Sequence, residues 1–220
     1  MAALEPFLAY PSIGHHGVIG DRRTAALVAA DGTIDWMCLP NYDGAPILGC
    51  LIDAERGGYW RVGPADVVLG QQHYRPESRV LVTTWQSENW ELELTDLMAW
   101  PWDERDADHG GADTRLLIRH LRCLRGEVTT VADFQPRYDF GETPPMASTP
   151  DGLTVGLGDS VGLLWASRSN AEGESRVTTD LRAGEEIWFV FAISDQADMQ
   201  LWTVERAARA VAGVDGRAGS

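Results

Sequence analysis

The sequence predicts an all-β protein, a large antiparallel β-sandwich with a short C-terminal helix. Short apolar-rich segments recur along the chain, and the turn-forming residues Gly, Pro and Asp separate them. No long segment of helical periodicity stands between them, which disfavours a parallel sheet with crossover helices. The length of 220 residues suits one all-β domain that buries a sizeable core.

A β-hairpin near the N-terminus is the clearest expected element. Residues 24–30 and 33–39 are apolar-rich, and the dipeptide Asp31-Gly32 between them accepts the positive φ of a two-residue turn. Side chains alternate along a strand, so Asp35 and Trp36 are expected on opposite faces of the second strand. The usual burial of aromatic side chains favours a core position for Trp36.

Further strands are expected along the chain, and one of them has a mixed pattern. In residues 115–124, Leu117 and Arg119 share one parity, and Leu116, Ile118 and His120 share the other. This pattern indicates burial on both faces. Roughly a dozen strands without long helices are typical of a large antiparallel sandwich. The other expected strands are residues 59–62, 67–74, 79–86, 90–98, 127–134, 153–157, 161–167, 174–181 and 186–193.

Two segments have a helical character. Residues 45–54 form a short apolar segment around Pro46, and residues 203–212 carry apolar side chains at helical spacing. We expect a sandwich domain over residues 1–195, followed by a linker helix and tail over 196–220. Charged or Pro-rich stretches predict surface loops at residues 103–113 and 141–152.

Composition argues against several classes of function. The formal charge is −15, from 18 basic residues, all Arg, and 33 acidic ones, so the surface repels phosphate backbones and acidic membranes. We therefore expect no nucleic-acid partner. The chain has no apolar run near the roughly 20 residues that span a bilayer, and no secretion signal is visible. These features predict a cytoplasmic protein without membrane contact.

The cysteine and histidine residues favour no metal site and no cofactor. Cys38, Cys50 and Cys123 are odd in number and lack CxxC spacing, which predicts buried free thiols. His15 and His16 are adjacent, but no third ligand stands at a supporting spacing, so a solvated loop is the favoured interpretation. The segment GLGDSVG at residues 156–162 is neither a phosphate loop nor a nucleophile elbow and predicts a hairpin turn.

Residues 19–46 read IGDRRTAALVAADGTIDWMCLPNYDGAP. This segment resembles the opening of the trehalase-like N-terminal domain of bacterial and archaeal glycoside hydrolase family 15 enzymes, whose pattern is roughly IGD-x-R-TAALV-x-x-DGSIDWLCLPRFDSP. The resemblance spans residues 10–193 and implies a super-sandwich fold. Similar segments follow in the family's order: HYRPESRVLVTTW (73–85), LELTDLMAW (92–100), LIRHLRCLRGEV (117–128) and FQPRYDFG (134–141).

The resemblance implies that catalysis resides outside this chain. In the family, an (α/α)6 barrel after the N-terminal domain hydrolyses α-glucosides with inversion: one Glu protonates the leaving oxygen and another activates water, with carboxyls about 6.5 to 9.5 Å apart. Twelve helices of about 12 residues each do not fit into the 27 residues that follow Ile193 (220 minus 193). We therefore expect no barrel and no catalytic residue here, and we predict that the chain by itself is inactive. Glucoamylase, isomaltose or dextran glucosidase and trehalase activities share this front domain, so the resemblance does not specify the α-glucoside.

Several carboxylates of the chain itself are weak candidates for a substitute catalytic pair. Sequence gives no distance between them, and partly buried carboxylates usually cap turns or pair with arginines. We expect Asp96 and Asp139 to do so, with Arg119 and Arg137 as examples of partners. The carboxylates considered are Asp35, Asp43, Asp96, Asp139 and Glu142.

The polar loop of residues 40–46 is the expected point of contact with the barrel or with a sugar. In the resembling enzymes this loop lies at the face that packs on the barrel. Asn41 replaces the family Arg, so a shorter neutral amide stands in place of a charged fork of donors. The candidate residues for a substrate-facing or barrel-facing role are Asp35, Trp36, Asn41, Tyr42 and Asp43.

Trp100 and Trp102 flank Pro101 in WPWDE, and spacing of two can place both rings on one side. Such a pair suits either sugar stacking or burial against a neighbouring domain.

Three roles for the chain stay open. It is the non-catalytic N-terminal domain of a glucoamylase-like or trehalase-like hydrolase, a stand-alone module that binds an α-glucan or trehalose, or a subunit that assembles with a separately encoded barrel. The expected partner is thus an (α/α)6 barrel, in cis or in trans, with an α-glucoside as the possible ligand.

Overall fold

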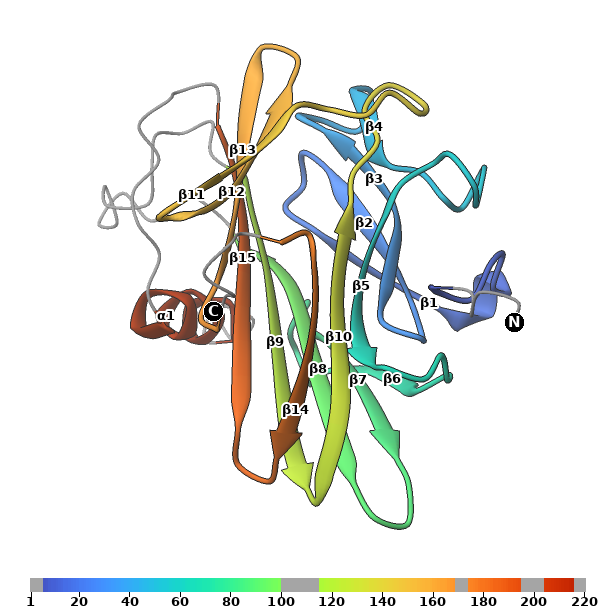
Figure 1. The fold of residues 1–220 in the computed structure, drawn as a ribbon, viewed down its shortest axis with the longest axis vertical. Coiled ribbons are helices and arrows are strands. Elements are labelled where there is room, and N and C mark those ends of the chain that lie inside the picture. Colours follow the sequence, from blue (N-terminus) through green and yellow to red (C-terminus); the bar gives the residue numbers. More distant parts are fainter. Residues whose placement is uncertain (1–5, 100–114, 169–173, 195–203, 216–220) are drawn as a thin grey trace.

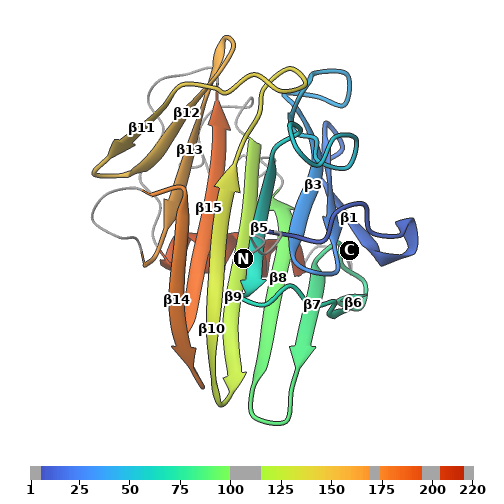
Figure 2. The same cartoon turned by 45° about the vertical axis from the view of Figure 1, so that its right-hand side comes forward.

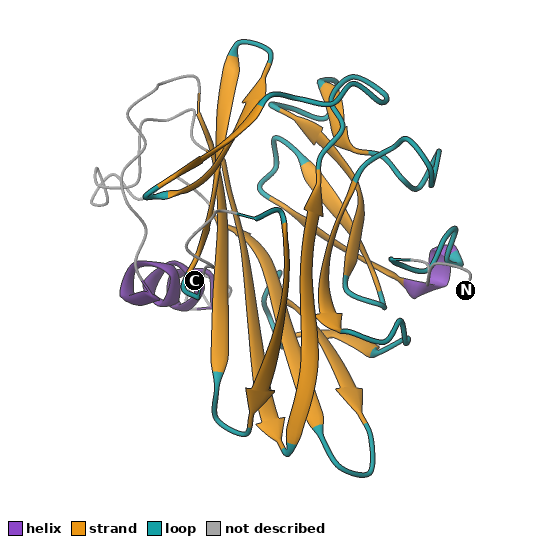
Figure 3. Ribbon diagram, in the orientation of Figure 1, coloured by secondary structure: helices purple, strands orange, loops and turns teal. Residues whose placement is uncertain are grey.

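The structure is a computed structural model and describes residues 6–99, 115–168, 174–194 and 204–215. In this part of the chain the strands form two antiparallel sheets, and one α-helix lies outside them (Figure 1). Figure 3 shows how far strands dominate. The predicted all-β sandwich with a short C-terminal helix is confirmed.

The first sheet, sheet A, is built around the N-terminal hairpin. Its order is β1-β2-β3-β5-β10-β14, and β4 pairs with β3 beside this path. A short 3-10 helix, η1 (Ile13–His15), precedes it. The strands are β1 (His16–Gly20), β2 (Ala25–Ala29), β3 (Thr33–Leu39), β4 (Ala45–Leu48), β5 (Tyr59–Pro64), β10 (Glu127–Gln135) and β14 (Arg176–Arg182).

The second sheet, sheet B, has the order β11-β12-β13-β15-β9-β8-β7-β6. Its long strands run in nearly the same direction as those of sheet A (Figure 2), which is the aligned mode of sheet packing. The strands are β6 (Gln71–Tyr74), β7 (Leu81–Gln86), β8 (Glu91–Ala99), β9 (Arg115–Arg125), β11 (Met146–Thr149), β12 (Gly152–Leu157), β13 (Ser160–Ala166) and β15 (Glu186–Ser194).

The central strands β8, β9 and β15 of sheet B are buried on both faces over most of their length, and β9 shows the reason. Leu117 and Leu121 belong to the main core between the sheets, whereas Leu116 and Ile118 belong to a second cluster on the outer face. Helix α1 (Val204–Asp215) covers that outer face with Ala207 and Val211, which lie one turn apart. The prediction that residues 115–124 are buried on both faces is therefore confirmed.

The predicted hairpin is present, but three residues, 30–32, connect β2 to β3 instead of the expected two. The turn contacts the opposite sheet. Gly32 has φ +85°, and its N–H donates to the Ala29 carbonyl at 2.9 Å. The Gly32 carbonyl accepts a hydrogen bond from Arg119 Nη2 of sheet B at 2.7 Å. The turn thus serves both the hairpin and the packing of the two sheets.

Four expectations about local structure need correction. Residues 45–48 form strand β4 instead of a helical turn; Pro46 is tolerated because β4 lies off the main path of the sheet. Strand β11 lies inside the expected loop 141–152, and all four of its residues are exposed, so it carries no apolar alternation. Of the expected strand 67–74, only residues 71–74 form a strand, β6.

The fourth correction concerns the expected solvated loop at the two histidines. His16 opens β1, and its side chain is only 2% exposed because it contacts Asp35. His15 is exposed at the end of η1.

Other expectations are confirmed or fall outside the described residues. Cys38, Cys50 and Cys123 are buried free thiols, and GLGDSVG forms the β12–β13 hairpin. The loop 103–113, Trp100 and Trp102, and the boundary between residues 195 and 196 lie outside the described residues. Among the described helices, none has the length and apolarity to cross a membrane.

Candidate functional site

A polar pocket opens where the ends of both sheets meet, and it includes the predicted candidate Asn41. We call it the end pocket; its volume is about 190 Å³. The β1–β2 turn, the β3–β4 loop, the start of β9, the β12–β13 turn and the end of β15 all contribute to it. Its lining residues are Arg23, Pro40, Asn41, Arg115, Ser160, Ile193 and Ser194.

Hydrogen bonds hold the β3–β4 loop against the β1–β2 turn. The Tyr42 N–H donates to the Arg23 carbonyl at 2.9 Å, and the Gly44 N–H donates to the Asn41 carbonyl at 3.0 Å. A cis peptide bond joins Leu39 to Pro40 at the start of the loop. The loop therefore brings Asn41 beside Arg23 through main-chain bonds that do not depend on the Asn41 side chain.

Asp21 organises the arginine side of the end pocket. Its Oδ1 accepts hydrogen bonds from the N–H groups of Arg23 and Thr24, both at 2.9 Å, so it fixes the β1–β2 turn. Its Oδ2 lies 3.6 Å from Nε of Arg115, whose side chain is only 4% exposed. One buried carboxylate thus positions both arginines of the pocket.

The lining of the end pocket is rich in side chains that carry hydrogen-bond donors. Two guanidinium groups, one amide and two hydroxyls line it, and no carboxylate is among its lining residues. This lining contains two Arg side chains and no acidic one, although the net charge of the whole chain is −15. Guanidinium and amide groups suit carboxylates or sugar hydroxyls as ligands.

Asp35 and Trp36 lie in strand β3, away from the exposed loop that follows it. Asp35 is buried, and its Oδ2 lies 2.7 Å from His16 Nε2. Burial raises the pKa of the Asp35 carboxyl, and the contact with His16 opposes this shift. Trp36 is half-buried, whereas the other residues of β3 are buried. The expected core position of Trp36 is therefore corrected to a partly exposed one.

Tyr42 and Asp43 lie on the outside of the same loop as Asn41. Both are exposed, and Tyr42 is 59% exposed. Two neighbouring loops present further apolar side chains, Ile52 at 62% and Phe140 at 68% exposure. The Phe140 loop lies beside β4, since the Asp139 N–H donates to the Pro46 carbonyl at 3.1 Å. It also lies beside the Ile52 loop, since a Cβ added at Gly141 would be 3.8 Å from the Arg56 Cβ. Figure 1 shows these loops at the β4 end of sheet A.

The carboxylates considered for catalysis lie in different environments: Asp35 and Asp96 are buried, and the others are exposed. Asp96 is fully buried, and its Oδ1 accepts a hydrogen bond from Arg119 Nε at 2.8 Å, as predicted. Asp139 lies in a turn with φ +45°, and Asp139 and Glu142 are exposed. No group of three His, Cys, Asp or Glu side chains in the described ranges has the arrangement of a metal site.

Sequence reasoning missed most of the end pocket. It singled out Asn41 but not Arg23, Arg115, Ser160 or Ser194. Arg23 stands in the opening motif and Arg115 begins a strand, but neither position reveals that the two side chains converge. The one local signal was Asp21, because an Asp that caps the following turn fixes the main chain at Arg23.

Fold and site together define a two-sheet β-sandwich domain with a donor-rich pocket at one end. The family model for the trehalase-like N-terminal domain matches residues 9–171. The chain belongs to this family.

Curated relatives agree with this membership. The chain is 34% identical over 140 residues to a trehalase of Thermoplasma volcanium, covering 62% of this chain and 22% of the relative. It is 30% identical over 189 residues to a trehalase of Mycolicibacterium smegmatis, covering 80% of this chain and 27% of the relative. The chain thus spans about a quarter of the length of these relatives.

A putative kojibiose phosphorylase from the human microbiome gives a TM-score of 0.35 at 10% identity, over 96% of this chain and 28% of the other.

Proposed function

We propose that this chain is the non-catalytic N-terminal domain of a glycoside hydrolase family 15 enzyme and supports a catalytic (α/α)6 barrel that acts on an α-glucoside. The observation that carries the proposal is the family membership, with a match to about a quarter of the length of proteins named trehalase. The burial of two of the candidate carboxylates supports the proposal. Asp35 and Asp96 are buried in contacts with His16 and Arg119 and have no access to a sugar.

Exposed apolar side chains support the proposal that a barrel docks at the β3–β4 loop and its neighbours. Tyr42, Ile52 and Phe140 project from three adjacent loops, and each is more than half exposed. Large exposed apolar side chains that gather on one surface are typical of interfaces. The end pocket opens next to Tyr42 through its neighbour Asn41, so a barrel that covers these loops would also border the pocket.

A hydrolysis assay tests the absence of catalysis. We expect the purified chain to release no glucose from trehalose, maltose or isomaltose above a blank, because the proposed role leaves the two carboxyl groups that inversion needs to the barrel. A parallel assay with a full-length trehalase relative verifies the conditions. Hydrolysis by the chain by itself, abolished by changing one of its own carboxylates, would refute the proposal.

Light scattering tests the docking surface. With Tyr42, Ile52 and Phe140 uncovered, the chain should self-associate at micromolar concentrations, and the double change Tyr42→Ser and Phe140→Ser should restore a monomer. Leu124→Ser is the matched control, because Leu124 is an exposed apolar residue at 37% near the β9–β10 turn. A monodisperse wild-type monomer would count against this surface.

The end pocket keeps a second role open, that of a module binding an α-glucan or trehalose. Its guanidinium, amide and hydroxyl donors match sugar hydroxyls. Isothermal titration with trehalose, maltose and isomaltose decides this alternative. Heat that disappears in Asn41→Ala favours it, and the absence of heat with all three sugars excludes it.

A further inference from the structure

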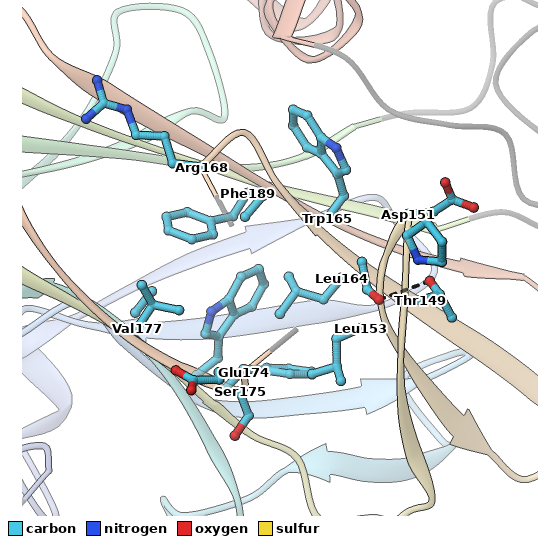
Figure 4. A pocket seen from close by; sticks show the side chains of 16 residues that line it. Thr149, Asp151, Leu153, Leu164, Trp165, Arg168, Glu174, Ser175, Val177 and Phe189 are labelled. Atoms are coloured by element: carbon cyan, nitrogen blue, oxygen red, sulfur yellow. Dashed lines mark hydrogen bonds between the residues drawn. The ribbon is translucent and has the colours of Figure 1, made fainter. Parts of the chain in front are cut away.

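A second cavity lies between the two sheets, where edge strand β14 of sheet A faces strands β12, β13 and β15 of sheet B (Figure 4). We call it the side cavity. Its volume is about 180 Å³, and it shares no lining residue with the end pocket. We propose that the side cavity binds a compact ring compound, aromatic or saturated, that carries a single hydroxyl or carbonyl group. This proposal does not depend on the proposed function.

The interior of the side cavity is apolar. Phe189 of β15, Leu153 of β12 and Leu164 of β13 line it from sheet B, and Ala132 and Val177 line it from sheet A. Protein interiors are normally packed without spaces of this size. An apolar cavity of about 150 Å³ is known to stay dry and to bind benzene, so the volume suits one six-membered ring.

Polar groups gather at the rim of the cavity. Arg168, Asp151 and Glu174 are exposed lining residues. In Figure 4, Arg168 and Asp151 lie on opposite sides of the view, with Phe189 and Leu164 between them. The hydroxyl of Thr149 is also at the rim and donates to the Gly152 carbonyl at 3.0 Å. A ring in the interior would therefore meet polar partners with one substituent at the mouth.

Trp60 forms part of the inner wall of the side cavity. It lines the cavity and is fully buried. Its Nε1 has no hydrogen-bond acceptor among the described residues, which is uncommon because buried polar groups are nearly always paired. Because Trp60 lines the cavity, its indole N–H signal can report that the side cavity is occupied.

The same lining argues against a sugar as the occupant. A pyranose carries hydroxyls around its whole ring, and most of them would be buried against Leu153, Leu164 and Phe189 without partners. The ligand class of the side cavity thus differs from the one that the end pocket suits.

Phenol and cyclohexanol are the probes for this site, with glucose as the counter-probe. Titration of the full chain is followed by the NMR signal of the Trp60 indole N–H, assigned by its loss in Trp60→Phe. We expect saturable shifts with phenol and cyclohexanol, with dissociation constants on the order of 1 mM for ligands of this size, and no saturable shift with glucose.

Val177→Phe tests the location, because the larger ring fills the cavity from edge strand β14. It should weaken phenol binding at least tenfold. The matched control is Thr178→Phe, which places the same ring at an exposed neighbouring position that does not line the cavity and should leave binding unchanged. If circular dichroism shows that Val177→Phe does not fold, Ala132→Leu fills the cavity from β10 instead.

Three results would overturn the proposal. The first is the absence of a saturable shift with either ring compound. The second is unchanged phenol binding in a folded cavity-filling variant. The third is glucose binding as tight as that of phenol, which would contradict the ligand class.

Discussion

At the residue scale, His120 shows how burial sets the charge of a single side chain. Its ring stacks on Trp188 with 3.7 Å between centroids and an angle of 10°, and its Nε2 lies 3.0 Å from Glu186 Oε2. Burial lowers the pKa of His120, and Glu186 opposes this shift. Burial also acts to raise the pKa of Glu186, but hydrogen bonds from Trp188 and His120 outweigh it and lower that pKa. Both directions fit a neutral ring that donates its Nε2 proton to a charged carboxylate.

This state predicts a pH dependence of stability. In the unfolded chain His120 has a pKa of about 6.5, above its value in the folded protein, so the unfolded state binds the proton first as the pH falls. The free energy of unfolding should therefore fall below pH 6.5, with a slope of at most about 1.4 kcal/mol per pH unit from this group. His120→Phe keeps an aromatic ring without titration and should reduce the loss between pH 8 and pH 5.5.

Urea denaturation at the two pH values measures the effect. The exposed His73, changed to Phe, is the control and should keep the wild-type pH dependence. An equal loss of stability in wild type and His120→Phe would show that His120 is not responsible.

At the element scale, the β2–β3 hairpin depends on one glycine for two reasons. Gly32 has a positive φ, and a Cβ added there would lie 2.0 Å from the Val62 carbonyl oxygen. The sequence predicted the first requirement from the Asp-Gly dipeptide. The second comes from β5, which passes close to the turn and which no local pattern places there.

A comparison of Gly32→Ala with Gly184→Ala separates the effect of positive φ from the effect of the close contact with Val62. Gly184 has nearly the same φ, +87°, and has no atom within 4 Å of an added Cβ. We expect Gly184→Ala to lower the free energy of unfolding by about 1 kcal/mol through backbone strain. Gly32→Ala should cost at least about 3 kcal/mol because the clash is added.

Chemical denaturation of both variants gives the comparison. Similar losses in Gly32→Ala and Gly184→Ala would mean that the close approach of Val62 does not constrain the turn.

At the scale of the whole molecule, Arg119 joins the two sheets. It lies on β9 of sheet B and pairs there with Asp96 of β8. Across the core it donates to the carbonyls of Trp60 and Gly32 in sheet A, both at 2.7 Å. Its guanidinium also lies 5.1 Å from the centroid of the Trp60 ring. The buried charge is therefore balanced by a carboxylate and two carbonyls, as a buried cation requires.

Arg119→Met should be strongly destabilising. The change leaves Asp96 as an uncompensated buried charge and removes one donor each from the Trp60 and Gly32 carbonyls, so a loss of about 3 to 5 kcal/mol is expected. Arg122→Met on the same strand is the control. Arg122 is 45% exposed and 3.3 Å from Glu93, so its loss should stay below about 1 kcal/mol.

The free energy of unfolding, from urea denaturation, is measured for both variants. A loss in Arg119→Met no larger than in Arg122→Met would contradict the assigned role in joining the sheets.

Several features were accessible from the sequence because their causes are local. Alternation of apolar side chains predicted most strands, and the Asp-Gly dipeptide predicted the hairpin turn. The two-sided pattern of residues 115–124 predicted a doubly buried strand, and Asp96 was expected to pair with an arginine such as Arg119. Strands β1, β4 and β11 were missed because glycine, proline or full exposure removes the alternation on which such predictions rest.

The sequence by itself determined the all-β class, the family and the hairpin, because these depend on side chains a few residues apart and on motifs read in order. Only the tertiary structure decided that Arg23, Asn41 and Arg115 line one pocket, that Arg119 reaches across to sheet A, and that a side cavity stays open beside β14. These arrangements depend on which strands become neighbours and how the two sheets pack. That choice is made by the burial of the whole core, so no single segment encodes it.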